Sequence, residues 1–356
     1  MIIRELRVNN IRPYTIYTAP LNPGVTLILG RNGTGKTTLL ESIHYLLQGT
    51  SFKGRDRDMI AHTAARANLL LTDAAGVERR ASLEILPDDK LKKVFTVEQK
   101  TTARLPAKYR APVVLFEPDE LRLLSSSPQR RRQFFDGILS RLYPQYATAL
   151  SRYQRVVLQR NELLKQQQAM QPASWDAQLF AWDIKFTELA DVITKLRNEI
   201  VRTSNGRLSE LYSSMAGSRH SVATTYQSSP SSNTYAQTLL RHLEQRRHAD
   251  AMHGYTSIGP HRDDFLVSLD GHPASESASR GEMRTIMLAY KLLEVELQRR
   301  VYGSNPVILM DDVFSELDST REQQLMAALK DHQTIITATD LRDELKINAS
   351  IITLTS

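Results

Sequence analysis

One segment of the chain combines glycines, a lysine and a hydroxyl at the spacing that binds phosphate. GRNGTGKT at 30–37 fits the pattern G-x-x-x-x-G-K-[ST] and lies between an apolar run at 25–29 and a helical pattern at 36–47. Glycines let the backbone curl so that N–H groups face a phosphate, and the helix N-terminus adds partial positive charge. We expect Lys36 to reach the β- and γ-phosphates of ATP and the Thr37 hydroxyl to hold Mg²⁺. The predicted nucleotide-binding residues of this loop are Gly30, Arg31, Asn32, Gly33, Thr34, Gly35, Lys36 and Thr37.

A second anchor for magnesium is expected where PVILMDDVFSELD at 306–318 ends an apolar run in two carboxylates. Adjacent carboxylates at a strand end repel each other and are poorly solvated unless a cation lies between them. We predict that Asp311 binds Mg²⁺ and that Asp312 polarises the attacking water, so that Lys36, Asp311 and Asp312 form the catalytic set. Two adjacent aspartates on their own are more often a solvated loop, and the phosphate-binding loop favours the functional interpretation.

A third segment, ESASRGEMRT at 276–285, places a hydroxyl, a glycine and a carboxylate at the start of a long helical pattern. Ser279, Gly281 and Glu282 would form a second anion site at a helix N-terminus. One nucleotide does not need two such sites in one chain. The segment therefore predicts contact with a partner's nucleotide, with ATP held between two protomers, although this short pattern is weak on its own.

The elements that position these residues alternate between apolar strands and helices at both ends of the chain. Apolar runs at 25–29, 113–116, 306–310 and 334–336 predict buried strands, and 282–301 predicts a long helix. In the middle, a helical run at 150–164 is followed by a break at Gln171-Pro172 and by a second run with a heptad seam, and the two runs predict an antiparallel hairpin of helices. The residues of the seam are Trp182, Phe186, Leu189, Ile193, Leu196 and Ile200. We expect an α/β domain formed by 1–120 and 216–356, with a helical lobe inserted at 121–215.

Composition limits the chemistry further. The chain has 356 residues, a formal charge of +7 and no cysteine, which excludes disulfides, thiolate metal sites and cysteine nucleophiles. No apolar run approaches the roughly 18–20 residues that cross a bilayer, and the charged N-terminus does not resemble a signal peptide, so a cytoplasmic protein is expected. The basic excess fits a polyanionic partner, and it also fits a surface that is merely soluble.

In combination, these motifs resemble the ABC-type heads of SMC-like ATPases, and more specifically the RecF family of bacterial DNA replication and repair proteins. Three further stretches support the resemblance: PDELRLLSSSPQRRRQFFD at 118–136, YPQYATALSRYQRVVLQRNELLK at 143–165 and GPHRDDF at 259–265. With the ATPase motifs they span nearly the whole chain in family order. The resemblance implies an ABC-type P-loop ATPase head with an inserted helical lobe.

The resemblance also implies a function. It implies an ATP-gated homodimer with slow, DNA-stimulated ATP hydrolysis, which binds double-stranded DNA and gap junctions and acts with RecR and RecO in loading RecA. Ser279 and Gly281 would contact the γ-phosphate across the dimer, and 315–318 matches the D-loop. Thr339 lies where many ABC ATPases have a switch histidine, and Asp312 replaces a glutamate, so ATP binding is better supported than its rate of hydrolysis.

DNA contacts are expected from basic residues and should be largely independent of sequence. The candidate groups, each of which could equally be a solvated surface, are Lys53, Arg55 and Arg57; Arg79 and Arg80; Lys92 and Lys93; and Arg130, Arg131 and Arg132. His261 and Arg262 could serve the ATP site, the DNA surface or lobe packing. Two alternatives remain open: a short SMC-like clamp that uses ATP only for dimerisation, and the nucleotide-binding subunit of a transporter.

Overall fold

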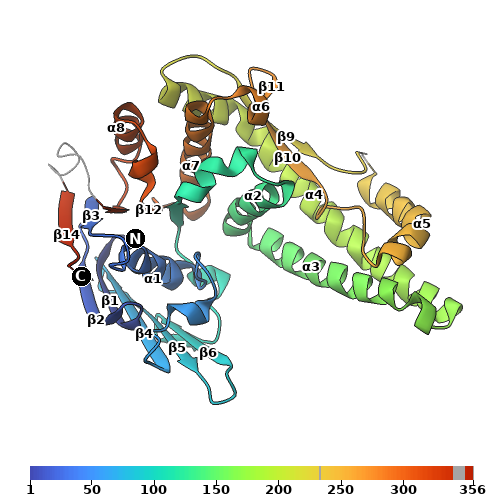
Figure 1. Ribbon diagram of the computed structural model, residues 1–356, viewed down its shortest axis with the longest axis horizontal. Coiled ribbons are helices and arrows are strands. Elements are labelled where there is room, and N and C mark those ends of the chain that lie inside the picture. The colour runs from blue at the N-terminus through green and yellow to red at the C-terminus, as the bar shows by residue number, and fades with distance from the viewer. Residues whose placement is uncertain (232–233, 340–348, 356) are drawn as a thin grey trace. The chain divides into compact units, whose positions relative to one another are not determined.

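A computed structural model describes residues 1–231, 234–339 and 349–355 (Figure 1). The chain divides into two compact units, one formed by Met1–Leu121 with Tyr290–Ser356 and the other by Arg122–Ala289. The division falls within helix α7 (Arg280–Tyr302). The first unit therefore joins the N-terminal and C-terminal parts of the chain, as the sequence predicted.

The phosphate-binding loop belongs to a parallel sheet in the first unit. Its strand order is β14-β3-β13-β12-β8, and each pair of neighbouring strands in this order is parallel. Side chains of the central strands are almost all buried, as expected for a parallel sheet covered on both faces. The strands are β3 (Val25–Leu29), β8 (Val113–Phe116), β12 (Val307–Asp311), β13 (Thr334–Ala338) and β14 (Ala349–Thr353).

An antiparallel sheet completes the core of the first unit. Its order is β2-β1-β4-β5-β6-β7, and apolar side chains from it form one buried cluster with helix α1 (Lys36–Gln48). The strands are β1 (Ile3–Ile11), β2 (Tyr14–Pro20), β4 (Arg66–Asp73), β5 (Glu78–Ile85), β6 (Leu91–Val97) and β7 (Lys100–Thr102). Shorter helices are η1 (Asp56–Met59), η2 (Ala107–Tyr109), η5 (Val313–Glu316) and α8 (Ser319–Ala328), while η3 (Pro118–Ser125) crosses the division between the units.

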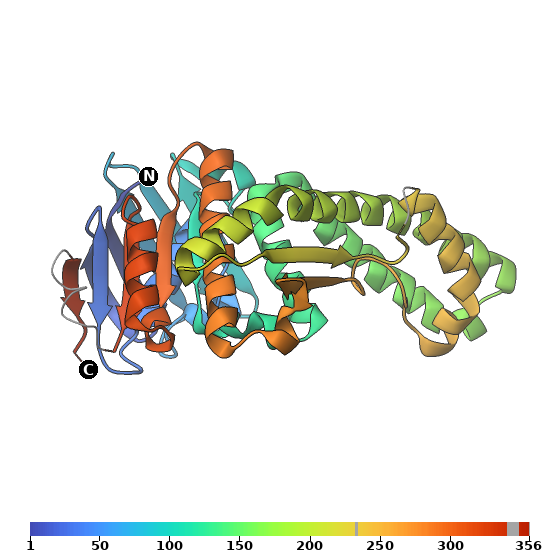
Figure 2. The same cartoon turned by 90° about the horizontal axis from the view of Figure 1, so that it is seen from above.

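The second unit is built around one long helix. In Figure 2, α3 (Pro144–Lys165) runs beside α4 (Pro172–Ala216), which confirms the predicted hairpin and its break before Pro172. A three-stranded antiparallel sheet of order β11-β10-β9 packs with these helices. The remaining elements are α2 (Pro128–Leu142), η4 (Gln167–Ala169), β9 (Val222–Gln227), α5 (Tyr235–His253), β10 (Asp264–Leu269), β11 (His272–Pro273) and α6 (Ala274–Ser277).

The predicted boundary at residue 216 needs correction. The segment 216–289 groups with the helical unit rather than with the head, because β9 packs along α4 and β10 packs against α2. Side chains of α4 also complete the edge of β9: Asn205 bonds both the N–H and the C=O of Thr224, and Ser209 does the same for Val222. The boundary predicted at residue 120 lies one residue from the observed one.

The buried face of α4 contains polar residues that the predicted heptad seam did not include. Leu189 and Leu196 are only half-buried, whereas Asp183 and Arg197 on the same helix are 0% and 1% exposed. Arg197 bonds both carboxylate oxygens of Asp136, and Asp183 accepts from Arg160 at 2.6 Å. Among the helices that the structure describes, none combines the length and apolar content needed to cross a membrane.

Candidate nucleotide-binding site

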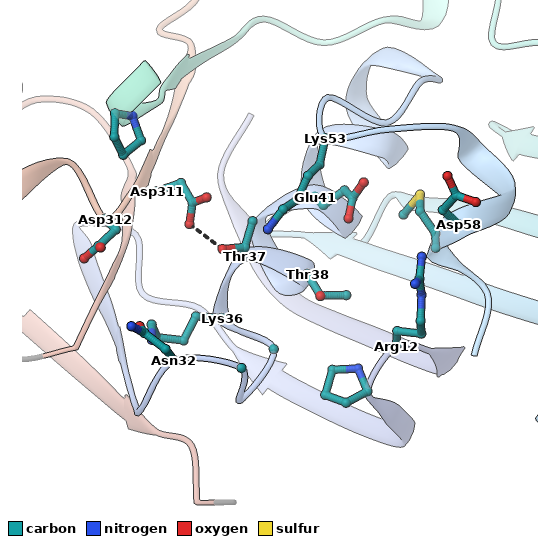
Figure 3. A pocket seen from close by; sticks show the side chains of 15 residues that line it. Arg12, Asn32, Lys36, Thr37, Thr38, Glu41, Lys53, Asp58, Asp311 and Asp312 are labelled. Atoms are coloured by element: carbon teal, nitrogen blue, oxygen red, sulfur yellow. Dashed lines mark hydrogen bonds between the residues drawn. The ribbon is translucent and has the colours of Figure 1, made fainter. Parts of the chain in front are cut away.

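The phosphate-binding loop connects the end of β3 to the start of α1 (Figure 3). Two of its glycines take positive φ values, 85° at Gly33 and 94° at Gly35, which residues with a Cβ rarely adopt. A Cβ on Gly35 would also lie 2.5 Å from Cδ of Pro13 and 2.7 Å from the hydroxyl of Tyr14. The turn between β1 and β2 therefore packs directly on the loop and requires glycine there.

Lys36 holds the loop from within. Its ammonium group donates to the carbonyl oxygens of Gly30 at 2.7 Å and Arg31 at 3.0 Å, and the residue is only 7% exposed. The hydroxyl of Thr34 also donates to Arg31, at 2.9 Å. These bonds hold the lysine within the loop, so little side-chain entropy remains to be lost when an anion binds.

The two segments predicted to hold magnesium meet at one hydrogen bond. The hydroxyl of Thr37, in the first turn of α1, donates to Oδ1 of Asp311 at the end of β12 over 2.7 Å. The structure thus brings together residues 274 positions apart in the chain. A hydroxyl and a carboxylate are the hard oxygen donors that Mg²⁺ prefers, so the residues present fit this ion.

A third residue at this point was not predicted. The hydroxyl of Thr337 on β13 donates to the same Oδ1 of Asp311 at 2.8 Å, because Asp311 and Thr337 are paired in the parallel ladder. Thr337 is 1% exposed, so this bond is shielded from water. The sequence carried one signal for it: a hydroxyl at the end of a predicted strand, two residues before Thr339.

Asp312 lies beside this pair in a left-handed backbone conformation, with φ of 51°. Its N–H donates to the carbonyl and the hydroxyl of Thr337, both at 3.1 Å. Burial raises the pKa of Asp312, Lys36 opposes that shift, and the charge of Asp311 adds to it. A raised pKa makes a carboxylate a better acceptor for a proton from water.

A cavity of about 620 Å³ extends from these residues to the opposite wall (Figure 3). Asn32, Gly33, Gly35, Lys36 and Thr37 line one side together with the two aspartates. The remaining lining residues were not predicted to contact the nucleotide; they are Arg12, Pro13, Thr38, Glu41, Lys53, Asp58, Met59 and Pro118. The volume lies within the range of small-molecule sites.

Further charged residues lie in the segment after β8 and on α7. Glu117 follows β8, and burial raises its pKa to about 7, with Glu120 and Asp311 adding to the shift and Lys291 opposing it. Lys291 on α7 is 3% exposed and pairs with Glu120 at 3.0 Å. This ion pair fixes the segment after β8 to α7 within the first unit.

The third predicted segment, ESASRGEMRT at 276–285 (the signature segment), forms a capping box at the start of α7. The N–H of Ser279 donates to the carboxylate of Glu282 at 2.7 Å, and the N–H of Glu282 donates to the Ser279 hydroxyl at 3.3 Å. Hydrogen bonds from the backbone N–H of Ser279 and from its side chain lower the pKa of Glu282. Ser279 is exposed, while the segment belongs to the second unit and the phosphate-binding loop to the first.

The other motif residues lie close to β12 and β13. Ser315 donates to the carbonyl of Asp312 at 2.7 Å, and Asp318 accepts from the N–H of Arg321 as the N-cap of α8. Thr339, one residue beyond β13, is exposed.

Most of the basic residues proposed for DNA are already engaged within the chain. Ion pairs join Arg55 to Asp58, Arg57 to Asp89, Arg80 to Glu78, Lys92 to Glu84, Lys93 to Asp56 and Arg131 to Asp264. Arg79 donates to the carbonyl of Tyr109 and Arg132 to that of Asp263. Lys53 lines the nucleotide cavity, and Arg130 is exposed without a carboxylate partner among the described residues.

His261 serves packing within the second unit. Its Nε2 lies 3.1 Å from the carbonyl of Thr256, which can only accept, so Nδ1 accepts from the hydroxyl of Tyr153 at 2.7 Å. Burial lowers the pKa of His261 to about 4 and keeps the ring neutral. Among the alternatives that the sequence left open for this histidine, the structure favours lobe packing.

Comparison with known proteins gives one consistent result. The family model described as an AAA domain matches residues 5–205. The DNA replication and repair protein RecF of Chloroflexus aurantiacus is 34% identical over 370 residues, covering 96% of this chain and 94% of that protein. A solved structure of the recombination mediator protein RecF with ATP, in the RecFOR pathway, is 26% identical with a TM-score of 0.84, covering 96% of this chain and 93% of that one. An SMC head bound to the C-terminal winged-helix domain of ScpA shares the fold, with a TM-score of 0.54, 17% identity, and coverage of 99% and 94%.

Proposed function

Because this chain belongs to the RecF family of DNA replication and repair ATPases, we propose that it is an ATP-gated dimer that binds gapped duplex DNA. Its nucleotide site would hold ATP and Mg²⁺ and hydrolyse ATP slowly. The observation that carries this proposal is the 2.7 Å bond between Thr37 and Asp311, which joins the phosphate-binding loop to the carboxylate at the end of β12.

The residues of the site divide the chemistry among themselves. Lys36 and the N–H groups at the start of α1 would bind the β- and γ-phosphates and stabilise charge that develops between them. Thr37 and Asp311 would hold Mg²⁺, which supplies charge neutralisation at the phosphates when it is bound. Asp312, with its raised pKa, would orient and polarise the attacking water. Arg12 and Lys53 provide positive charge on the opposite wall of the cavity.

Dimerisation is proposed from the signature segment. Its N-terminal position on a 23-residue helix and its exposed serine suit an anion that comes from outside the unit. In the capping box the Ser279 hydroxyl accepts from the N–H of Glu282 and bonds the Glu282 carboxylate, so it would turn from that carboxylate to donate to a phosphate oxygen. In a dimer, each chain would thus complete the nucleotide site of the other.

Action on DNA gaps with RecR and RecO, upstream of RecA loading in the bacterial cytoplasm, is proposed from family membership. The RecF structure that this chain resembles is itself placed in the RecFOR pathway. A second candidate function, a clamp that uses ATP only for dimerisation, is favoured by one observation: the exposed Thr339 cannot switch protons as a histidine would.

The test combines sedimentation with a single-turnover assay. Wild-type protein should dimerise with Mg²⁺ and ATP, whereas Lys36→Met should remain monomeric because the phosphates lose their main counter-ion. Lys330→Met, which removes an exposed charge on the same unit, is the matched control and should dimerise normally. Dimerisation of Lys36→Met with ATP would refute the gating proposal. Dimerisation without phosphate release, even with gapped DNA, would establish the clamp instead.

A further inference from the structure

The GPHRDDF segment, which the nucleotide site does not use, borders a second cavity of about 910 Å³ within the second unit. Gly259, Arg262 and Asp263 of this segment line it, together with the loop after β9 and residues of α4 and α5. The lining is rich in hydrogen-bonding groups that carry no charge. They include the side chains of Ser228, Ser229, Ser231, Ser257, Asn198 and Gln227.

Two arginines in this cavity have no anionic partner in the described part of the chain. Neither Arg246 nor Arg262 forms an ion pair with any residue that the structure describes. Arg262 is held in place, since its Nε donates to the carbonyl of Thr256 at 3.3 Å and its guanidinium lies 4.9 Å from the ring centre of Tyr255. Arg246 makes only a long contact of 3.4 Å with the hydroxyl of Ser257. The two exposed guanidinium groups thus retain most of their donors.

The carboxylates that line the same cavity are already satisfied. Asp263 accepts from the hydroxyl of Tyr226 and from the N–H of Ser229, and it is 4% exposed. Asp264 forms a two-pronged ion pair with Arg131, with bonds of 2.6 and 3.0 Å. Asp264 is neutralised by Arg131, and the buried Asp263 contributes one negative charge against the two exposed arginines, so the net charge at the cavity is positive.

The chemistry of the lining selects among anions. Guanidinium forks bind phosphate oxygens in pairs, and serine hydroxyls and amides commonly add bonds to a sugar–phosphate backbone. The two aromatic rings of the lining are not free to stack on a base, because Tyr226 is only 7% and Tyr235 only 6% exposed. The cavity therefore suits the phosphate backbone rather than a nucleobase.

We propose that this cavity is a DNA-contact site in which Arg246 and Arg262 bind backbone phosphates. The proposal rests on the proposed DNA-binding function and names the surface that carries it. This surface does not include the basic groups expected from the sequence, most of which are paired within the chain. Binding here would be independent of base sequence and sensitive to salt.

The test compares DNA affinity among matched variants, using a gapped duplex with ATP and Mg²⁺ at several salt concentrations. Arg246→Ala combined with Arg262→Ala should weaken binding at least about tenfold and reduce the slope of log affinity against log salt by about 1.8, since each phosphate contact contributes about 0.9. Arg241→Ala is the control, because this exposed arginine lies five residues before Arg246, about 140° around α5. Replacing both arginines by lysine should restore the slope but only part of the affinity.

The outcomes separate this proposal from the one on which it rests. If wild-type protein binds no DNA, the proposed function fails. If wild-type protein binds DNA and the double alanine variant binds equally well, the cavity assignment is wrong. Titration with inorganic phosphate provides the remaining arm: binding to wild type that is lost in the variant, with unchanged DNA affinity, would assign the cavity to a free anion and overturn the proposal. Unchanged ATP binding and melting temperature show that the variant is folded.

Discussion

Replacement of Thr337 by valine would test how Asp311, the proposed magnesium ligand, is held. Valine keeps the shape and the β-branch of threonine, so the substitution removes a hydroxyl and little else. That hydroxyl donates to Asp311 at 2.8 Å and accepts from the N–H of Asp312 at 3.1 Å, inside a strand that is fully buried. Both aspartates would then lose a partner at the same time.

The structure sets the size of the expected effect. A hydrogen bond to a charged group contributes about 1.5–3 kcal/mol, and Asp311 keeps its second hydroxyl partner, Thr37, at 2.7 Å. We therefore expect Thr337→Val to lower the free energy of unfolding by about 2 kcal/mol. Groups that orient a metal ligand are worth about 10–100-fold in metal affinity, so the Mg²⁺ concentration for half-maximal ATP hydrolysis should rise by that factor.

The assay is a Mg²⁺ titration of ATP hydrolysis, together with urea unfolding of the metal-free protein. Thr334→Val on the same strand is the control, because Thr334 is equally buried and its hydroxyl bonds only the neutral carbonyl of His332, at 3.2 Å. It should cost about 1 kcal/mol and leave the Mg²⁺ titration unchanged. The reasoning is refuted if both variants shift the Mg²⁺ midpoint equally, or if neither does.

Three further perturbations address the loop, the signature and the segment after β8. Gly35→Ala should abolish ATP binding, because its Cβ would lie 2.5 Å from Cδ of Pro13. In Gly33→Ala the new Cβ would meet nothing within 4 Å, so only the left-handed backbone conformation should cost about 1 kcal/mol of conformational free energy. Titration of both variants with nucleotide checks this difference. Ser279→Arg should spare ATP binding and block dimerisation, and loss of ATP binding in the variant would contradict an in-trans role. The pKa of Glu117 is raised from 4.5 to about 7, so its ionisation disfavours the folded state and stability falls as pH rises through that window. Glu117→Gln should flatten this fall in urea unfolding at pH 5 and 8, and an unchanged pH profile would refute it.

The sequence predicted the parts of the fold that depend on uninterrupted apolar strands. The runs at 25–29, 113–116 and 306–310 became β3, β8 and β12, each within a residue of its expected place. These strands lie next to β13 or to one another in one parallel sheet. Because both faces of such a sheet are buried, its strands appear in the sequence as continuous apolar runs. The placement of Thr37 beside Asp311 follows from that sheet.

The second unit was predicted less well because polar groups determine much of its packing. Periodicity counts apolar residues, so it placed Leu189 and Leu196 in the seam and passed over Asp183 and Arg197. Burying Arg197 is tolerable only because Asp136 lies opposite it, 61 residues away in the chain. No local pattern reports such a pairing, and the same holds for the side chains of α4 that complete the edge of β9.

The basic residues proposed to bind DNA show that ionic pairing also could not be predicted from the sequence. Clusters of basic residues are conspicuous in a sequence, yet in this chain they lie near acids: Lys93 pairs with Asp56 at 2.7 Å and Arg131 with Asp264 at 2.6 Å. Both pairs are largely shielded from water, so a phosphate would have to displace the carboxylate, whereas the exposed pairs of Arg55 and Arg80 contribute little and could exchange their carboxylate for a phosphate. Arg246 and Arg262 stand apart in sequence but face one polar cavity without a carboxylate partner among the described residues. Unpaired charge in a preformed cavity, rather than the density of basic residues, is therefore the basis on which we propose where this protein would contact DNA.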